Sequence, residues 1–351
     1  MRATVLHAPY DVRLEQAPDP KLEGAGDAVV RVLAGCVCGS DLWPYRGDPP
    51  VREPRRMGHE FVGVVEEIGD DVSGVRVGDL VVAPFLWSDG TCEYCVRGLQ
   101  TSCRHGGGYG GRDRAGRLVD GGQGEAVRVP EADGTLVPVP RSPQDVDARL
   151  LASLLTLSDV MGTGHHAALA AGVGQGSTVA VVGDGAVGLC GVLAARRLGA
   201  SRIVAMSRHA SRQEVARRLG ATDVVEERGE EGARAVAELL GGIGADCVLE
   251  CVGSGASMQQ ALATVRDGGG VGYVGVPHDV ELPVRELFRR NVSVGGGVAP
   301  ARAYLPELLA DVLAGRIDPS PVFDVEMPLD DVAEAYRAMH ERRAIKVLLR
   351  P

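Results

Sequence analysis

A short glycine-rich turn near the middle of the chain restricts the fold more than any other feature of the sequence. It reads Gly183-Asp184-Gly185-Ala186-Val187-Gly188, follows the apolar run TVAVV (178–182) and opens a helical pattern. Strand, glycine turn and helix in this order predict the first unit of a parallel, doubly wound sheet. Further short strands are expected at 202–207, 222–225, 245–253 and 269–277.

Each glycine of the turn has a physical role in binding a dinucleotide. Gly183 permits the tight turn, Gly185 lets a pyrophosphate approach the backbone, and Gly188 lets helix and strand pack closely. Ala186 and Val187 begin the helix and offer free backbone N–H groups to phosphate. The alternative is an ordinary strand–helix turn in a chain with 49 glycines among 351 residues.

The end of the second strand bears on the choice of dinucleotide. NAD sites usually carry an acidic residue there, which binds the ribose 2′-hydroxyl. This chain has Ser207 and Arg208, with Arg212 close behind. Because a serine and arginines suit a 2′-phosphate, we expect NADP rather than NAD. The alternative is that Arg208 is one more surface arginine.

The rest of the chain indicates two domains. Residues 1–150 contain short β-segments separated by turns, whereas 148–172 is mostly helical in character. After two expected helices, 303–316 and 329–342, the chain ends in a strand that can return to the first domain. We therefore expect a β-rich domain over 1–155, completed by 295–351, and a dinucleotide-binding domain over 156–294.

Composition excludes several classes of function. A net charge of −10 does not favour nucleic-acid binding, and no apolar run is long enough to predict a transmembrane helix or a signal peptide. We expect a cytoplasmic protein with no membrane or nucleic-acid partner. The eight cysteines should then be reduced, and the clustered ones indicate metal.

Cys38 and His59 are good zinc ligands, and each lies beside an expected strand. A catalytic zinc needs three protein ligands and an open position. The residues alone leave the third ligand open among several candidates: Cys36, Glu60, Asp159, His165 and His166.

Four motifs together resemble the zinc-dependent alcohol dehydrogenases of the medium-chain dehydrogenase/reductase superfamily. They are CGSD (38–41), GHEFVGVVEEIG (58–69), GTCEYC (90–95) and the glycine turn, and the resemblance extends over essentially the whole chain. It implies an α/β protein with a GroES-like β-rich catalytic domain and a Rossmann domain.

The resemblance also implies roles for residues of the catalytic zinc site. Cys38, His59 and Asp159 would bind the zinc, because 158–166 is similar to the bacterial NADP-dependent branch, which has an Asp as third ligand. Asp41 would orient His59, and Glu60 would lie behind the metal or coordinate it transiently. Ser40 would begin the proton route; beyond it the route stays open, because Trp43 replaces a relay histidine.

Other residues are assigned by the same resemblance. Asp89, Cys92, Cys95 and Cys103 match the structural zinc lobe, with Asp89 in place of a fourth cysteine. The alternative is a metal-free lobe with three thiols. Gly275 and Val276 would hold the nicotinamide carboxamide, and Lys346 would lie near a cofactor phosphate.

The expected activity is reversible hydride transfer between an alcohol and its aldehyde or ketone, with zinc and NADP(H). One alternative is a polyol, threonine or formaldehyde-type dehydrogenase of the same fold. A second is a non-catalytic NADP-binding protein, against which the complete set of metal-site residues argues. The family implies a homodimer or homotetramer, and nothing in the sequence chooses between them.

Overall fold

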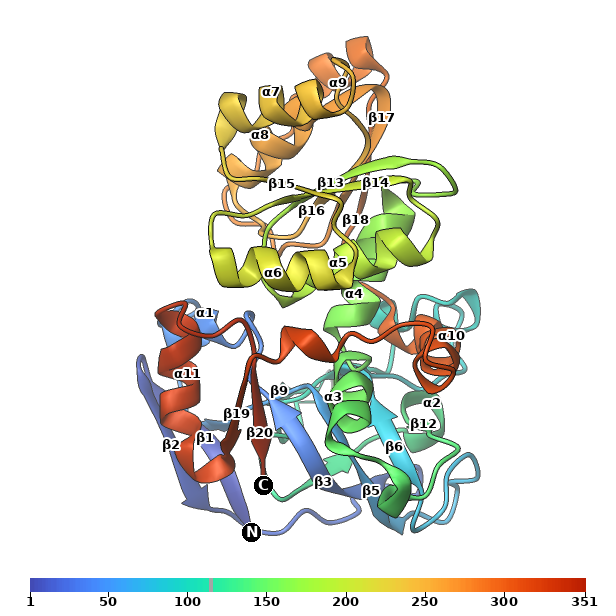
Figure 1. The fold of residues 1–351 in the computed structure, drawn as a ribbon. Coiled ribbons are helices and arrows are strands. Elements are labelled where there is room, and N and C mark those ends of the chain that lie inside the picture. Colours follow the sequence, from blue (N-terminus) through green and yellow to red (C-terminus); the bar gives the residue numbers. More distant parts are fainter. Residues whose placement is uncertain (114–115) are drawn as a thin grey trace. The chain divides into compact units, whose positions relative to one another are not determined.

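The structure is a computed structural model that describes residues 1–113 and 116–351, and its chain divides into two compact units (Figure 1). The first unit comprises Met1–Asp159, Pro300–Arg316 and Phe323–Pro351. The second comprises Val160–Ala299 and Ile317–Val322.

The first unit is built mainly of antiparallel strands. Its largest sheet has the order β12-β6-β5-β3-β20-β19, with β11 also paired to β3. The strands of this sheet are β3 (Ala28–Cys36), β5 (Phe61–Ile68), β6 (Leu80–Ala83), β11 (Ala126–Val129), β12 (Val137–Pro138), β19 (Val325–Pro328) and β20 (Val347–Arg350). A smaller sheet, in the order β2-β1-β4, contains β1 (Arg2–Ala8), β2 (Asp11–Gln16) and β4 (Arg55–Arg56).

Short strands and five α-helices complete the described part of the first unit. The two-residue strands form two pairs: β7 (Leu86–Trp87) with β8 (Gly107–Gly108), and β9 (Gly111–Arg112) with β10 (Leu118–Val119). The α-helices are α1 (Leu42–Tyr45), α2 (Ala132–Thr135), α3 (Ala148–Thr156), α10 (Ala301–Leu313) and, near the C-terminus, α11 (Val332–His340). Because β20 pairs with both β3 and β19, the last residues of the chain lie inside the first unit's main sheet.

The second unit contains a six-stranded sheet in the order β15-β14-β13-β16-β17-β18, and every neighbouring pair is parallel. Its strands are β13 (Thr178–Val182), β14 (Arg202–Met206), β15 (Asp223–Val225), β16 (Ala245–Glu250), β17 (Val265–Tyr273) and β18 (Ser293–Gly296). Its helices are α4 (Val160–Ala170), α5 (Ala186–Arg197), α6 (Ala210–Leu219), α7 (Gly229–Leu239), α8 (Gly255–Thr264) and α9 (Val284–Arg290).

The sequence of the second unit explains its layers. The central strands β13 and β14 are almost wholly buried runs of Val, Ala, Ile and Met, as expected when helices cover both faces of a parallel sheet. Figure 1 shows α5 and α6 on one face and α7 and α8 on the other. The doubly wound parallel sheet predicted from the glycine turn is therefore confirmed.

Two features differ from the expected secondary structure. The helical stretch expected over 148–172 is broken, because α3 ends at Thr156 and α4 begins at Val160. The helices α7, α8 and α9 were not anticipated. The break has a consequence for function, since Asp159 lies in it.

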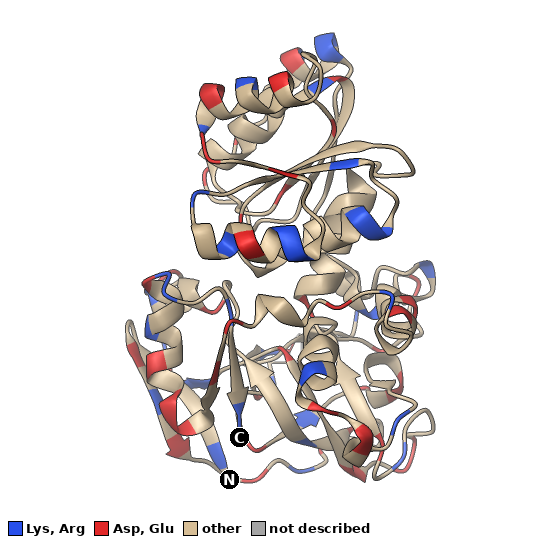
Figure 2. Cartoon of the chain, viewed as in Figure 1, with Lys and Arg blue, Asp and Glu red and all other residues tan. Residues whose placement is uncertain are grey.

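Acidic and basic residues are interspersed on the outer helices of the second unit, for example along α6 (Figure 2). In the part of the chain that the structure describes, no helix is both long and apolar enough to cross a membrane.

Candidate metal and cofactor sites

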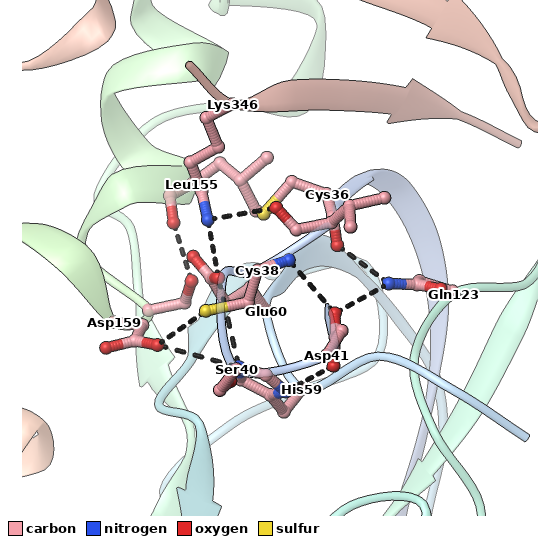
Figure 3. A network of polar contacts seen from close by, with 12 residues as sticks. Cys36, Cys38, Ser40, Asp41, His59, Glu60, Gln123, Leu155, Asp159 and Lys346 are labelled. Atoms are coloured by element: carbon pink, nitrogen blue, oxygen red, sulfur yellow. Dashed lines mark hydrogen bonds and ion pairs between the residues drawn. The ribbon is translucent and has the colours of Figure 1, made fainter. Parts of the chain in front are cut away.

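Four side chains from distant parts of the sequence meet in the first unit (Figure 3). Cys38, His59, Glu60 and Asp159 each offer a donor atom, and these atoms lie within 4.8 Å of one another. Cys38 follows the end of β3, His59 and Glu60 immediately precede β5, and Asp159 follows α3. Adjacent strands and the helix break therefore bring one sulfur, one nitrogen and two carboxylates to one point.

The spacing of these donors suits a tetrahedral zinc. The Cys38 Sγ is 3.6 Å from Asp159 Oδ2, and His59 Nε2 is 3.5 Å from the same oxygen. Zinc bonds of about 2.0–2.3 Å at tetrahedral angles separate such donors by roughly 3.3–3.8 Å. Both distances to Asp159 Oδ2 therefore match the spacing of two ligands on one zinc ion.

The two ring nitrogens of His59 face different partners. Nδ1 is 3.3 Å from Asp41 Oδ1, and Nε2 is directed at the donor cluster, with the Ser40 hydroxyl 3.4 Å away. The second oxygen of Asp41 accepts the backbone N–H of Cys38 at 2.9 Å. Asp41 thus favours the tautomer with hydrogen on Nδ1, which leaves Nε2 free to bind a metal.

Burial and neighbouring charges both shift the pKa values in the cluster. Burial raises the pKa of the Cys38 thiol. For His59, burial lowers the pKa, but the nearby Asp41 and Cys38 outweigh it and hold the pKa well above its usual value. A cation at the centre would favour the metal-binding forms, thiolate and neutral imidazole, of both side chains. The donor set therefore fits a divalent metal.

Glu60 and Lys346 form a buried ion pair beside the cluster. Their side chains are 0% and 1% exposed, and Lys346 Nζ is 2.7 Å from Glu60 Oε1 and donates to the Val37 carbonyl at 3.3 Å. Burial lowers the pKa of Lys346, but neighbouring acidic groups, Glu60 among them, hold it well above its usual value. The phosphate contact expected for Lys346 stays a prediction, and the partner observed is Glu60.

The five candidates for the third ligand separate clearly. Glu60 and Asp159 place donor atoms in the cluster. Cys36 ends β3 and lies outside this group of donors, whereas His165 and His166 belong to α4 of the second unit.

A second group of donors lies in the same unit. Asp89, Cys92, Cys95 and Cys103 also have donor atoms within 4.8 Å of one another. The Cys92 Sγ is 3.6 Å from that of Cys95 and 3.8 Å from that of Cys103. Sulfur atoms on a tetrahedral zinc are about 3.8 Å apart, so this lobe also fits the metal.

Asp89 is held as a carboxylate by its surroundings. Its Oδ1 accepts the backbone N–H groups of Thr91 and Cys92, and its Oδ2 lies 2.7 Å from Nδ1 of His105. Burial raises the pKa of Asp89, but these hydrogen bonds outweigh it and hold the pKa well below its usual range. The backbone N–H of Arg104 lowers the pKa of Cys92 to about 7. The sequence analysis did not identify His105, which only the fold brings to Asp89.

The glycine turn of the second unit leaves room for a ligand at one position only. A Cβ on Gly188 would lie 2.0 Å from the Gly183 carbonyl oxygen, and Gly183 has φ of +118°. A Cβ on Gly185 would meet nothing within 4 Å. Gly185 is also the N-cap of α5, and because it has no side chain it cannot cap the N–H groups at the start of the helix. The open position at the helix N-terminus fits a pyrophosphate.

The end of β14 differs from the prediction in one respect. The sequence predicts a site without a carboxylate, yet Asp184 of the glycine turn accepts a hydrogen bond from Ser207 at 2.7 Å. Arg212 Nη1 is 3.2 Å from Asp184 Oδ1, and Arg208 is exposed. The expectation was wrong because the acidic group comes from the glycine turn that follows the neighbouring strand β13, not from the end of β14.

Gly275 and Val276 follow β17 in the second unit and pack on the loop after β16. A Cβ on Gly275 would lie 2.1 Å from the backbone nitrogen of Gly253, so only glycine fits. Val276 is 53% exposed. Their expected contact with the nicotinamide stays a prediction.

Comparisons with known proteins match the chain along almost its whole length. Residues 24–141 match the alcohol dehydrogenase GroES-like domain, and residues 186–314 match the zinc-binding dehydrogenase family. A probable zinc-binding alcohol dehydrogenase of Mycobacterium tuberculosis is 36% identical, covering 100% of this chain and 89% of its own. A glutathione-independent formaldehyde dehydrogenase of Pseudomonas aeruginosa is 31% identical over 95% and 94% of the two chains. The solved alcohol dehydrogenase TADH from Thermus sp. ATN1 superposes with a TM-score of 0.90 at 33% identity, covering 100% and 99% of the chains.

Proposed function

The chain belongs to the zinc-dependent alcohol dehydrogenases of the medium-chain dehydrogenase/reductase superfamily, and on that premise we propose that it interconverts alcohols and their aldehydes or ketones with NADP(H). The observation that carries this proposal is the buried donor set of Cys38, His59 and Asp159, with spacings that suit a tetrahedral zinc. Three protein ligands leave the fourth position open to substrate.

The residues around the donor set have separate tasks. When bound, zinc supplies the Lewis acid that stabilises negative charge on the substrate oxygen, and the nicotinamide accepts or donates hydride. Asp41 orients His59, and Lys346 compensates the charge of the buried Glu60. The Ser40 hydroxyl, 3.4 Å from His59 Nε2, is near enough to the donor set to pass the alcohol proton outward.

The lobe of Asp89, Cys92, Cys95 and Cys103 would hold a second, structural zinc. All four ligand positions of that tetrahedron are filled by protein, so the lobe has no open position for a substrate. Its metal would therefore stabilise the fold of the lobe and take no part in the reaction.

The proposed preference for NADP rests on Ser207 and Arg208 at the end of β14, which suit a 2′-phosphate. Asp184 carries a charge that opposes such a phosphate, and Arg212 compensates it at 3.2 Å. Arg208 is exposed and would supply the charge that decides between the two cofactors.

A formaldehyde-type dehydrogenase is the second candidate, and it is favoured by the relative of that name. A substrate panel separates it from a general alcohol dehydrogenase, because only the former would turn over formaldehyde far faster than larger aldehydes. A non-catalytic NADP-binding protein would turn over none.

The test combines metal content with turnover. Elemental analysis should find two zinc ions per chain, one for each donor set, and Cys38→Ala should retain one and lose NADPH oxidation with every aldehyde and ketone. One zinc in the wild type and none in Cys38→Ala would mean that the Asp89 lobe binds no metal. Turnover that survives loss of the Cys38 metal would overturn the proposal.

The cofactor preference needs its own measurement. Wild-type kcat/KM should be higher with NADPH than with NADH. Arg208→Ala should lower that ratio by about 10- to 100-fold, since a charge-assisted hydrogen bond is worth about 1.5–3 kcal/mol. Arg218→Ala in helix α6 serves as the control, because it removes an exposed arginine that lies farther along the chain, near the end of that helix. Equal ratios in all three proteins would mean that Arg208 does not select the cofactor.

A further inference from the structure

A buried glutamine, Gln123, packs beside His59 and belongs to neither donor set. Gln123 is 2% exposed and sits in the segment between β10 and β11. Its backbone N–H donates to Met57, and a Cβ on Gly58 would lie 2.5 Å from its Cγ. Gln123 therefore packs directly on Gly58, the residue before His59, and a side chain on Gly58 would collide with it.

The amide of Gln123 is directed at Asp41. Its Nε2 donates to the carbonyl of Cys36 at 2.9 Å and to Asp41 Oδ2 at 3.2 Å (Figure 3). These two bonds account for both amide hydrogens. With the N–H of Cys38 on the same oxygen, Asp41 Oδ2 has two donors, and its Oδ1 is left for His59 Nδ1.

Tyr336 determines which way the amide points. This tyrosine, from α11, is 0% exposed, and its hydroxyl donates to Gln123 Oε1 at 2.9 Å. With Tyr336 donating to Oε1, the amide nitrogen must face Asp41. If the amide were reversed, its oxygen would face the carboxylate oxygen of Asp41, which is repulsive.

We propose that Gln123 and Tyr336 are positioning residues for the metal site: through Asp41 they hold the His59 ring so that its Nε2 meets the metal. This inference rests on the proposed function, because it needs His59 as a ligand. The path Tyr336–Gln123–Asp41–His59 runs from the last helix of the chain to the metal-binding imidazole. Partners of this kind typically change metal affinity 10–100-fold.

The test uses variants that remove single groups. Tyr336→Phe deletes the hydroxyl and leaves the ring packed on Tyr45, 5.3 Å away, while Gln123→Leu removes the amide. Tyr45→Phe is the matched control, since Tyr45 has no part in the hydrogen-bonded path. Each protein is titrated with Zn²⁺ against a competing chelator, and a second sample is loaded with Co²⁺ to record its visible spectrum. Signals that disappear in Cys38→Ala are assigned to the site of Cys38, His59 and Asp159.

We expect the zinc dissociation constant of this site to rise about tenfold in Tyr336→Phe and 10–100-fold in Gln123→Leu, with a changed Co²⁺ spectrum. Tyr45→Phe should match the wild type in both. Wild-type affinity and spectrum in folded Tyr336→Phe and Gln123→Leu would overturn the inference and leave the proposed function standing. A wild-type protein with no signal that depends on Cys38 would instead overturn the proposed function.

Discussion

At the scale of single residues, a buried pair of opposite charges lies beside the proposed metal site. Glu60 is wholly buried, and the ammonium of Lys346 is its counter-charge at 2.7 Å. The composition gives a hint of this role, because Lys346 is one of only two lysines in a chain whose other basic residues are arginines. A lysine retained inside such a protein indicates a specific partner.

Lys346→Met should therefore destabilise the protein by about 3–5 kcal/mol, because it leaves a buried carboxylate without its counter-charge. Chemical unfolding of the zinc-loaded protein would measure the loss. The double variant Lys346→Met/Glu60→Gln removes both charges and should recover most of the stability. Equal stability of the single and double variants would show that the ion pair does not account for the effect.

At the scale of elements, two glycines of the same turn, Gly185 and Gly188, are required for different physical reasons. Gly188 lies in the first turn of α5 and must be small so that the helix can pack against the turn at Gly183. Gly185 has φ of −79°, which any residue can adopt, and has open space beside it. Packing thus requires glycine at position 188, whereas only the bound cofactor would require it at position 185.

The two glycines give a matched pair of variants. Gly185→Ala should keep the wild-type melting temperature and lose at least tenfold in NADPH affinity, because its methyl group would fill the space expected for pyrophosphate. Gly188→Ala should lower both, since overpacking costs about 1–3 kcal/mol. Thermal unfolding and fluorescence titration with NADPH measure the two effects. Wild-type NADPH affinity in Gly185→Ala would place the pyrophosphate elsewhere.

At the scale of the whole molecule, the chain forms two units, and the proposed sites for metal and for dinucleotide lie in different units. Both donor sets lie in the first unit, whereas the glycine turn lies in the second. The chain's only two tryptophans, Trp43 and Trp87, are also in the first unit. Tryptophan fluorescence therefore reports the unfolding of the metal-binding unit alone.

Removal of zinc by a chelator should lower the midpoint of the tryptophan transition, because a ligand that binds only the folded state stabilises it by mass action. At a zinc concentration 100 times its dissociation constant, the loss is about 2.7 kcal/mol. Cys38→Ala should still respond to the chelator through the Asp89 lobe. A midpoint that does not move on chelation would show that neither donor set binds zinc tightly.

Local motifs in the sequence predicted the fold of both units and most of the proposed donor residues. Their signals are local: the glycine turn needs its three glycines at fixed spacing, and Cys38, His59 and the three lobe cysteines lie in short motifs. The family comparisons confirmed the two-part fold that those motifs predicted.

Contacts between side chains that lie far apart in the sequence become visible only in the tertiary structure. Gln123 and Tyr336 are 213 residues apart, and Lys346 and Glu60 are 286 apart. Asp184 contacts Ser207 from the glycine turn, 23 residues earlier in the chain. The break between α3 and α4 contains Asp159. No proline lies in it, so the sequence carries no strong signal that the helix is interrupted there. These contacts depend on how segments far apart in the sequence pack against one another, which local residue patterns do not encode.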